Sequence, residues 1–244
     1  MSPLVTIAKR EFRSYFDSPV AYVVICLSFL GLGLMVFAMG GAFWQADRAT
    51  LVQMFAVVPK GLSVLVIPVV TMRLLAEERA SGTLEMLITL PVKDSDVILG
   101  KYFGALGLVL TLLATTAIYP LAMFYKPWHL GALDWGPVSS AYLGLALFSA
   151  AAVAIGLLIS TITDSQAVAF FLTFFTLGAI WWVGDVANGM EGAAGGVLRY
   201  ISFSTRLDGF IRGLVDTRDI IYFLSVTALS LVVAFRALER RKWA

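Results

Sequence analysis

The stretch VSSAYLGLALFSAAAVAIGLLISTI, residues 138–162, contains no acidic or basic side chain. A helix needs roughly 20 consecutive apolar residues to cross the hydrocarbon core of a bilayer, which is about 30 Å thick. This stretch is therefore long enough to span a membrane as one helix. The rest of the chain has the same character, because 59% of its 244 residues are hydrophobic, 14% are charged, and its mean hydropathy is +0.87. That apolar share exceeds the share of a soluble domain.

Apolar runs of sufficient length occur six times and predict an all-α integral membrane protein with six transmembrane helices. Glycines and prolines inside these runs, such as Gly31 and Pro120, are tolerated in lipid because neighbouring helices satisfy the freed backbone groups. We place the spans near residues 19–43, 54–76, 98–124, 138–162, 167–187 and 219–236.

Residues 1–18 precede the first span and predict an amphipathic helix in the membrane interface. The apolar side of this helix carries Leu4, Ala8, Phe12, Tyr15 and Phe16, and another side carries Lys9, Arg10 and Arg13. Such a helix attracts anionic headgroups, so membrane lipid is an expected partner. The alternative is a solvated basic tail, which would leave the aromatic side chains exposed to water.

Basic residues near the span ends predict the orientation, because cytoplasmic loops hold the excess of lysine and arginine. Six spans place both termini on one side, and eleven of the 18 basic residues fall on that side against seven on the other. Four of those seven lie in the long segment 188–218, where the rule is less strict. We therefore expect a multi-pass protein of the plasma membrane (the bacterial inner membrane) with both termini in the cytoplasm.

Side chains suited to ion coupling, catalysis or metal binding are missing from the predicted spans. Transporters driven by ion gradients keep charged groups at mid-membrane despite a cost of about 2.5 kcal/mol or more for each charge. The central parts of the six spans carry no such group, and the chain has one histidine and one cysteine, too few for a metal site. A phosphate-binding GxxxxGK[ST] loop is also absent. We expect no catalytic residue, metal site or cofactor on this chain, and no nucleic-acid partner.

EERASGTLEMLITLPV, residues 77–92, interrupts the apolar pattern between the second and third spans. Gly82 permits a turn, Thr83 can cap a new helix, and Glu85 stands in the first turn, where the helix dipole favours an anion. An apolar ridge at i, i+3 and i+4 and a terminating proline follow; these are Leu84, Leu87, Ile88 and Pro91. Such a helix suits a groove on a partner protein, and the alternative is an ordinary loop along the headgroups.

The same segment resembles the ABC-2 type permeases, the membrane subunits of ATP-binding cassette transporters. In that family the segment reads E-x-x-x-G-T-x-E-x-L-L-x-x-P and leads to a lysine at the start of span three, here in GKYFG at 100–104. Ile88 replaces the usual leucine. The resemblance implies a cytosolic coupling helix at 77–92 with the ATPase-coupling residues Glu77, Glu78, Arg79, Gly82, Thr83, Leu84, Glu85, Leu87, Ile88 and Pro91.

The resemblance also implies the partners and the power source. A pair of cytosolic ABC ATPase subunits would hold ATP and Mg, and this chain, a single ABC-2 type transmembrane domain over residues 1–244, would be a subunit without enzyme activity. A second permease copy or a related permease is expected, and no internal repeat supplies it within the chain. Closure of the ATPase would tilt the coupling helix, and we expect rigid second and third spans to carry the movement.

Small residues at Gly100, Gly104 and Gly107 allow close contact between helices. We interpret this stripe as internal packing within the chain. The alternative is a seam between two copies.

Residues 188–218 lie between the last two spans and predict an extracytoplasmic re-entrant or interfacial element. Its apolar residues would be disfavoured in a plain solvated loop, which is the alternative. From residue 207 the sequence is similar to the gliding-motility branch, where F-D-x-x-x-R-G-x-x-D-x-R-D-x-x-Y is typical, with Leu207 in place of the aromatic residue. Two arginines are available to three acids as ion pairs, and the site residues are Asp208, Arg212, Asp216, Arg218 and Asp219.

Two functions follow from these resemblances. The first is export of an unidentified substrate, driven by ATP hydrolysis on the partner. The alternative is an ATP-driven mechanical transducer for an extracytoplasmic assembly, with an accessory protein on that side of the membrane.

Overall fold

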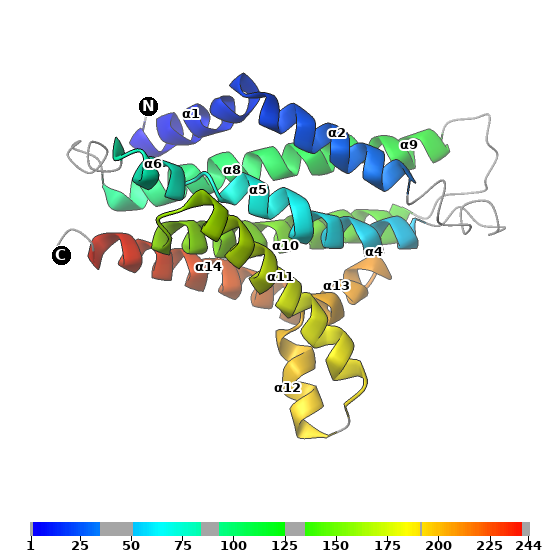
Figure 1. The fold of residues 1–244 in the computed structure, drawn as a ribbon. Coiled ribbons are helices and arrows are strands. Elements are labelled where there is room, and N and C mark those ends of the chain that lie inside the picture. Colours follow the sequence, from blue (N-terminus) through cyan, green and yellow to red (C-terminus); the bar gives the residue numbers. More distant parts are fainter. Residues whose placement is uncertain (1, 35–50, 84–92, 125–134, 191, 241–244) are drawn as a thin grey trace.

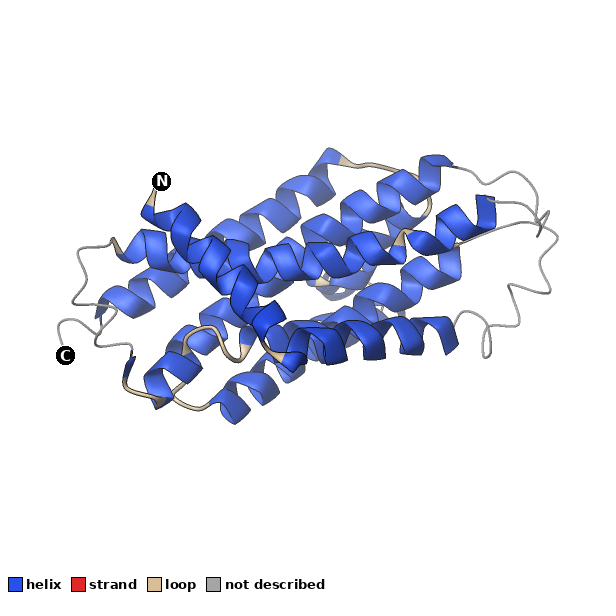
Figure 2. Cartoon of the chain, turned by 90° about the horizontal axis from the view of Figure 1, so that it is seen from above, coloured by secondary structure: helices blue, strands red, loops and turns tan. Residues whose placement is uncertain are grey.

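The structure of the protein, a computed structural model, describes residues 2–34, 51–83, 93–124, 135–190 and 192–240. These residues form helices joined by turns, and none of them lies in a strand (Figures 1 and 2). The prediction of an all-α membrane protein is confirmed, because five helical stretches of the described chain are long and apolar enough to cross a membrane. These stretches are Met54–Ala80, Asp94–Leu121, Trp135–Ile162, Gln166–Ala187 and Thr217–Arg240.

A sixth span depends on the first two helices, α1 (Pro3–Asp17) and α2 (Pro19–Gly33). They are long and apolar enough only as a pair, and they are bent by 70° at their junction. The remaining elements are α4 (Val52–Gly61), η2 (Leu62–Val66), α5 (Ile67–Thr71), α6 (Ala76–Ala80), α8 (Asp94–Thr116), α9 (Ile118–Phe124), α10 (Trp135–Ile162), α11 (Gln166–Asn188), α12 (Ala193–Ile201), α13 (Phe203–Ile211) and α14 (Thr217–Arg240).

The long helix α10 holds the bundle together, because it packs against α14, α13, α8, α11 and α5. Residues 151–154 of α10 are fully buried and small, three of them alanine. In lipid the hydrophobic effect does not drive helices together, so small side chains that permit close approach favour packing.

The elements lie in a consistent order along the bundle (Figures 1 and 2). α6, the start of α8 and the C-terminal ends of α10 and α14 meet at one end, which we call the α6 end. α4, α9, α13 and the start of α10 lie toward the opposite end, which we call the α13 end. A helix that runs the length of the bundle therefore connects the α6 end with the α13 end.

The second span is not one regular α-helix. It consists of α4, the π-helical η2 and α5, and after a break at residues 72–75 it continues as α6. Pro59 and Pro68 lie within it, and each proline removes a backbone donor and crowds the preceding turn. The third span is regular by comparison, because α8 is continuous over 23 residues.

The glycine stripe on α8 faces α1. A Cβ atom at Gly100 would lie 2.7 Å from Cγ2 of Ile7, and one at Gly104 would lie 2.6 Å from Cβ of Glu11. Real side chains do not approach so closely, so only glycine permits α1 to lie at this distance from α8. The interpretation of the stripe as internal packing is confirmed.

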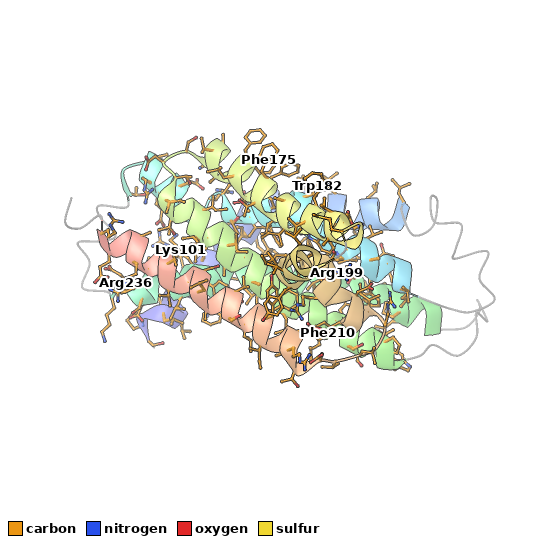
Figure 3. The ribbon with its side chains drawn as sticks, turned by 90° about the horizontal axis from the view of Figure 1, so that it is seen from below. Lys101, Phe175, Trp182, Arg199, Phe210 and Arg236 are labelled. Carbon is orange, nitrogen blue, oxygen red and sulfur yellow. The ribbon has the colours of Figure 1, made fainter. Side chains whose placement is uncertain are left out.

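α12 packs against the C-terminal part of α11, and the two form a hairpin that stands out from the bundle (Figure 1), whereas α11 also packs against α10, α5 and η2. Large apolar side chains are exposed along α11, and Phe175 and Trp182 are 64% and 69% exposed (Figure 3). Exposed apolar residues also follow α14, among them Leu224 and Leu229. Apolar surface of this extent is suited to lipid or to another protein.

Candidate functional site

The predicted coupling segment begins as α6, directly after the break in the second span. Glu77, Glu78 and Arg79 lie on this short helix, and Gly82 follows it with a φ of 72°, which favours glycine. The turn expected at Gly82 is therefore present. The other predicted coupling residues lie outside the described residues; these are Leu84, Glu85, Leu87, Ile88 and Pro91.

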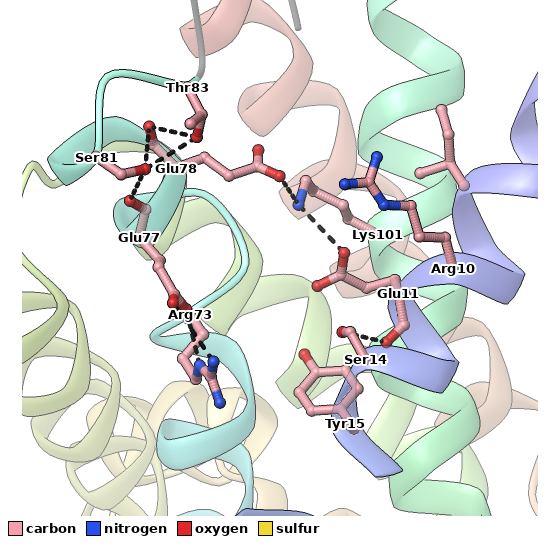
Figure 4. A pocket seen from close by; sticks show the side chains of 11 residues that line it. Arg10, Glu11, Ser14, Tyr15, Arg73, Glu77, Glu78, Ser81, Thr83 and Lys101 are labelled. Carbon is pink, nitrogen blue, oxygen red and sulfur yellow. Dashed lines mark hydrogen bonds and ion pairs between the residues drawn. The ribbon is translucent and has the colours of Figure 1, made fainter. Parts of the chain in front are cut away.

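Glu78 ties α6 to two other helices through a buried lysine. The Lys101 ammonium group on α8 donates to Oε1 of Glu78 at 2.8 Å and to Oε2 of Glu11, on α1, at 3.3 Å (Figure 4). The Lys101 side chain is only 4% exposed. A buried charge is stable only when it is paired and hydrogen-bonded, so this lysine holds α1, α6 and α8 in one arrangement.

Arg79 ties α6 to the end of α10. Its guanidinium donates to the Thr161 carbonyl, to the Thr163 carbonyl at 2.9 Å, and to the Asp164 carboxylate at 3.0 Å. The last carbonyls of a helix have no partner within the helix, so a basic side chain stabilises them. Arg79 thus occupies a C-terminal capping position on a helix that lies more than 80 residues away in the sequence.

Ser160 on α10 forms the opposite connection. Its hydroxyl oxygen accepts from the backbone N–H groups of Leu75 at 3.0 Å and Ala76 at 3.1 Å. These donors belong to the start of α6, where the residue at the N-cap position is Leu75 and has no side-chain acceptor. A serine of α10 therefore caps α6, and an arginine of α6 caps α10.

The remaining contacts of the segment are local. Glu77 accepts from Nε of Arg73 at 2.8 Å, one helical turn away in sequence. The Thr83 hydroxyl donates to the Glu78 carbonyl at 3.2 Å and lies 2.9 Å from the Ser81 hydroxyl. These bonds close the turn that ends α6.

A cavity of about 600 Å³ lies between α1, α6 and α8 (Figure 4). Its wall carries three acids and three bases; these are Glu11, Glu77, Glu78, Arg10, Arg73 and Lys101. Tyr15 also lines it, and its hydroxyl donates to the Val70 carbonyl at 3.0 Å.

The predicted element between the last two spans forms α12, α13 and the start of α14. Arg212 donates to Asp208 at 2.7 Å, which is one of the expected ion pairs. Asp219 pairs instead with Arg206 at 2.7 Å, and this arginine lies 4.3 Å from the centre of the Tyr200 ring. The Asp216 carboxylate accepts from the Arg218 backbone N–H at 2.8 Å and so caps α14. Among the described residues, the Arg218 side chain forms no ion pair.

Several of these residues were not predicted as site residues. Lys101 is predicted as the lysine of the family motif and as a basic residue near a span end, but its ion-pair partners are not predicted, although a lysine inside an apolar helix is itself a functional signal. Arg206 precedes the motif and was not assigned a partner. Ser160 carries no signal in the sequence, because serine is common in membrane helices and its spatial neighbours cannot be deduced from one chain.

Comparison with known proteins places these features in a family. A family model described as "ABC-2 family transporter protein" matches residues 49–237, which are 189 of the 244 residues. The matched range begins after α2 and includes α6, Lys101, Ser160 and the pair formed by Arg206 and Asp219. No curated protein matches the chain.

Proposed function

Because the chain belongs to the ABC-2 family of transporter proteins and is thus the membrane component of an ABC transporter, we propose that a separate pair of cytosolic ATPase subunits drives it through residues 77–91. The ATPase pair holds ATP and Mg, and its closure moves α6. The α6 end and both chain termini face the cytoplasm of a bacterial cell, as the excess of basic residues on that side favours. The movement leads to export of a substrate across the inner membrane.

The connections of α6 carry this proposal. Glu78 reaches α8 and α1 through Lys101, and Arg79 reaches the Thr161 carbonyl in the last turn of α10. A force on α6 therefore acts on three helices at once, without a rigid second span. Packed interiors deform little, so a displaced α6 shifts its neighbours or breaks buried polar contacts.

The exposed surface of α11 and α14 supports the expected partners in the membrane. Phe171, Phe175 and Trp182 on α11 are exposed, as are Leu224 and Leu229 on α14. A second permease copy, or a related permease, and membrane lipid are the partners suited to this surface. The basic face of α1 adds an attraction to anionic headgroups.

The test of the proposal replaces Glu85 with lysine and Leu87 with alanine in the same chain. The ATPase that co-purifies with the wild-type chain from native membranes is expected to dissociate, or to lose its stimulation, while the thermal stability of the permease stays unchanged. Replacement of Arg236 and Glu239, an exposed ion pair at the α6 end of α14, is the control and should leave the complex intact. Normal complex and normal stimulated ATPase activity in the Glu85 and Leu87 variant would reject the docking assignment.

Mechanical transduction is the second candidate function. The ion-paired element of α13 and α14 lies at the end of the bundle away from α6, and its sequence is similar to the gliding-motility branch. An extracytoplasmic accessory protein would bind there. ATPase activity that rises with substrate in liposomes supports export, whereas activity that rises only with an extracytoplasmic protein supports transduction.

A further inference from the structure

α10 connects the two ends of the bundle as one continuous helix. Its 28 residues correspond to about 42 Å at 1.5 Å per residue. Its one proline, Pro137, lies in the first turn, where a helix tolerates it. The second span, in contrast, is distorted at η2 and broken at residues 72–75. A displacement of α6 is therefore transmitted along α10 more directly than along the span to which α6 belongs.

The C-terminal end of α10 holds α6 on two sides. The Ser160 hydroxyl oxygen accepts hydrogen bonds from two backbone N–H groups at the start of α6, and Arg79 of α6 donates to the carbonyls of Thr161 in the last turn of α10 and of Thr163 just after it. One turn earlier, a Cβ atom at Gly156 would lie 2.4 Å from Oγ1 of Thr71. Ser160 is fully buried, so loss of its hydroxyl leaves buried backbone donors without a partner.

The N-terminal part of α10 holds α13 in a similar way. The Ser140 hydroxyl donates to the Phe210 carbonyl at 2.7 Å, the shortest of its three contacts. A Cβ atom at Gly144 would lie 2.7 Å from Cβ of Phe210, so α13 rests directly on the α10 backbone. Gly213 follows α13 with a φ of 89° and contacts Pro137. Both ends of α10 thus combine a buried serine hydroxyl with a glycine contact.

We infer that Ser160 and Ser140 are positioning residues through which α10 couples α6 to α13. Movement of α6 shifts the C-terminal end of α10, and the continuous helix displaces the element formed by α13 and the start of α14. This inference rests on the proposed function for its role in the transport cycle. The coupling itself is a property of the permease chain and is measurable without any ATPase.

The experiment is hydrogen–deuterium exchange of the full permease in lipid nanodiscs. Ser160→Ala should raise exchange in residues 75–83 and, about threefold or more, in the distant residues 203–213. Ser140→Ala should raise exchange in residues 203–213 and also in 75–83, because coupling between two sites is reciprocal. Ser160→Thr keeps the hydroxyl and should restore exchange toward the wild-type rate at both ends.

Ser149→Ala is the matched control. Ser149 lies on the same helix and is fully buried, and its hydroxyl has no hydrogen-bond partner among the described residues. Its replacement should leave the exchange rates of residues 75–83 and of residues 203–213 unchanged. The inference is overturned if Ser160→Ala affects only residues 75–83, if it affects neither end, or if Ser149→Ala has the same effect as Ser160→Ala.

Global unfolding of one variant would not prevent a decision. If exchange in the Ser160→Ala protein also rises throughout α8, that variant is unfolded. The effect of Ser140→Ala on exchange in residues 75–83 then decides whether the inference holds. An unchanged rate there overturns the inference. Because no ATPase is present, failure of this coupling is distinguishable from failure of the ATPase partnership.

Discussion

The ammonium group of Lys101 lies 2.8 Å from a carboxylate oxygen of Glu78, although the two residues belong to different helices. The lysine is shared with Glu11, so one buried cation holds two acids from two other helices. The acids keep 29% and 19% of their side-chain surface exposed, whereas the lysine keeps 4%. Removal of the lysine leaves both acids without their shared cation, whereas removal of one acid leaves the lysine paired with the other.

The first prediction concerns this lysine. Lys101→Met should lower the free energy of unfolding by about 3 kcal/mol, at the lower end of the range for a broken buried pair because the acids are partly exposed. Equilibrium unfolding by SDS in mixed micelles measures the change. The double variant with Glu78→Gln should lose less than the sum of the two single losses, because the residues interact. Lys93→Met, at an exposed lysine that precedes the same helix, is the control, and an equal loss in that variant would contradict the prediction.

The helices were predictable from the sequence because long apolar runs can satisfy their backbone groups in lipid only as helices. The break at residues 72–75 was not predictable in the same way. The break depends on contacts with the C-terminal end of α10. The Ser160 hydroxyl of α10 accepts from the Leu75 backbone N–H at the break, and Arg79 donates to the Thr163 carbonyl just after α10. The sequence shows Pro68 before the break, but it does not show which helix lies beside it.

The candidate site was predictable in part for a similar reason. Gly82 indicates a turn because glycine readily adopts a positive φ, and a turn is present there. The partners of Glu78 and Asp219 depend on tertiary packing, which places Lys101 and Arg206 beside them. The same packing places the stripe of Gly100 and Gly104 against α1, where the sequence could indicate only that some close helix contact exists.

The second prediction concerns the contact between α1 and α8. Gly104→Ala should destabilise the chain by about 1–3 kcal/mol, since the new methyl group would lie 2.6 Å from Cβ of Glu11. Gly178→Ala on α11 is the matched control, because a Cβ atom there meets nothing within 4 Å. Alanine favours a helix over glycine, so the control should be equally stable or slightly more stable than the wild type. SDS unfolding compares the two variants, and equal stability would show that α1 does not depend on this close approach.

The third prediction separates a buried ion pair from an exposed one in the same element. Arg206→Met should destabilise the chain by about 3 kcal/mol, because Asp219 is left unpaired with only 12% of its side chain exposed. Arg212→Met should change stability by less than about 1 kcal/mol, because Arg212 and Asp208 are 70% and 56% exposed. Arg206→Lys should not restore full stability, since lysine lacks the planar group that lies over Tyr200. Similar losses in the Arg206 and Arg212 methionine variants would contradict this assignment.

The last prediction concerns the orientation of the bundle in the membrane. α14 has 24 residues, about 36 Å as a helix, so its two ends can lie on opposite sides of a bilayer. Val215 precedes its start and is exposed, and Ser81 lies in an exposed turn at the α6 end.

Cys26 is the single cysteine of the chain, so Cys26→Ala gives a cysteine-free background. Ser81→Cys should then react with a membrane-impermeant maleimide only in inside-out vesicles, and Val215→Cys only in intact spheroplasts. Ala152→Cys, at a fully buried position, should react in neither preparation. Labelling of Ser81→Cys and Val215→Cys from the same side would show that α14 does not cross the membrane, and reversed labelling would place the α6 end outside, beyond the reach of a cytosolic ATPase.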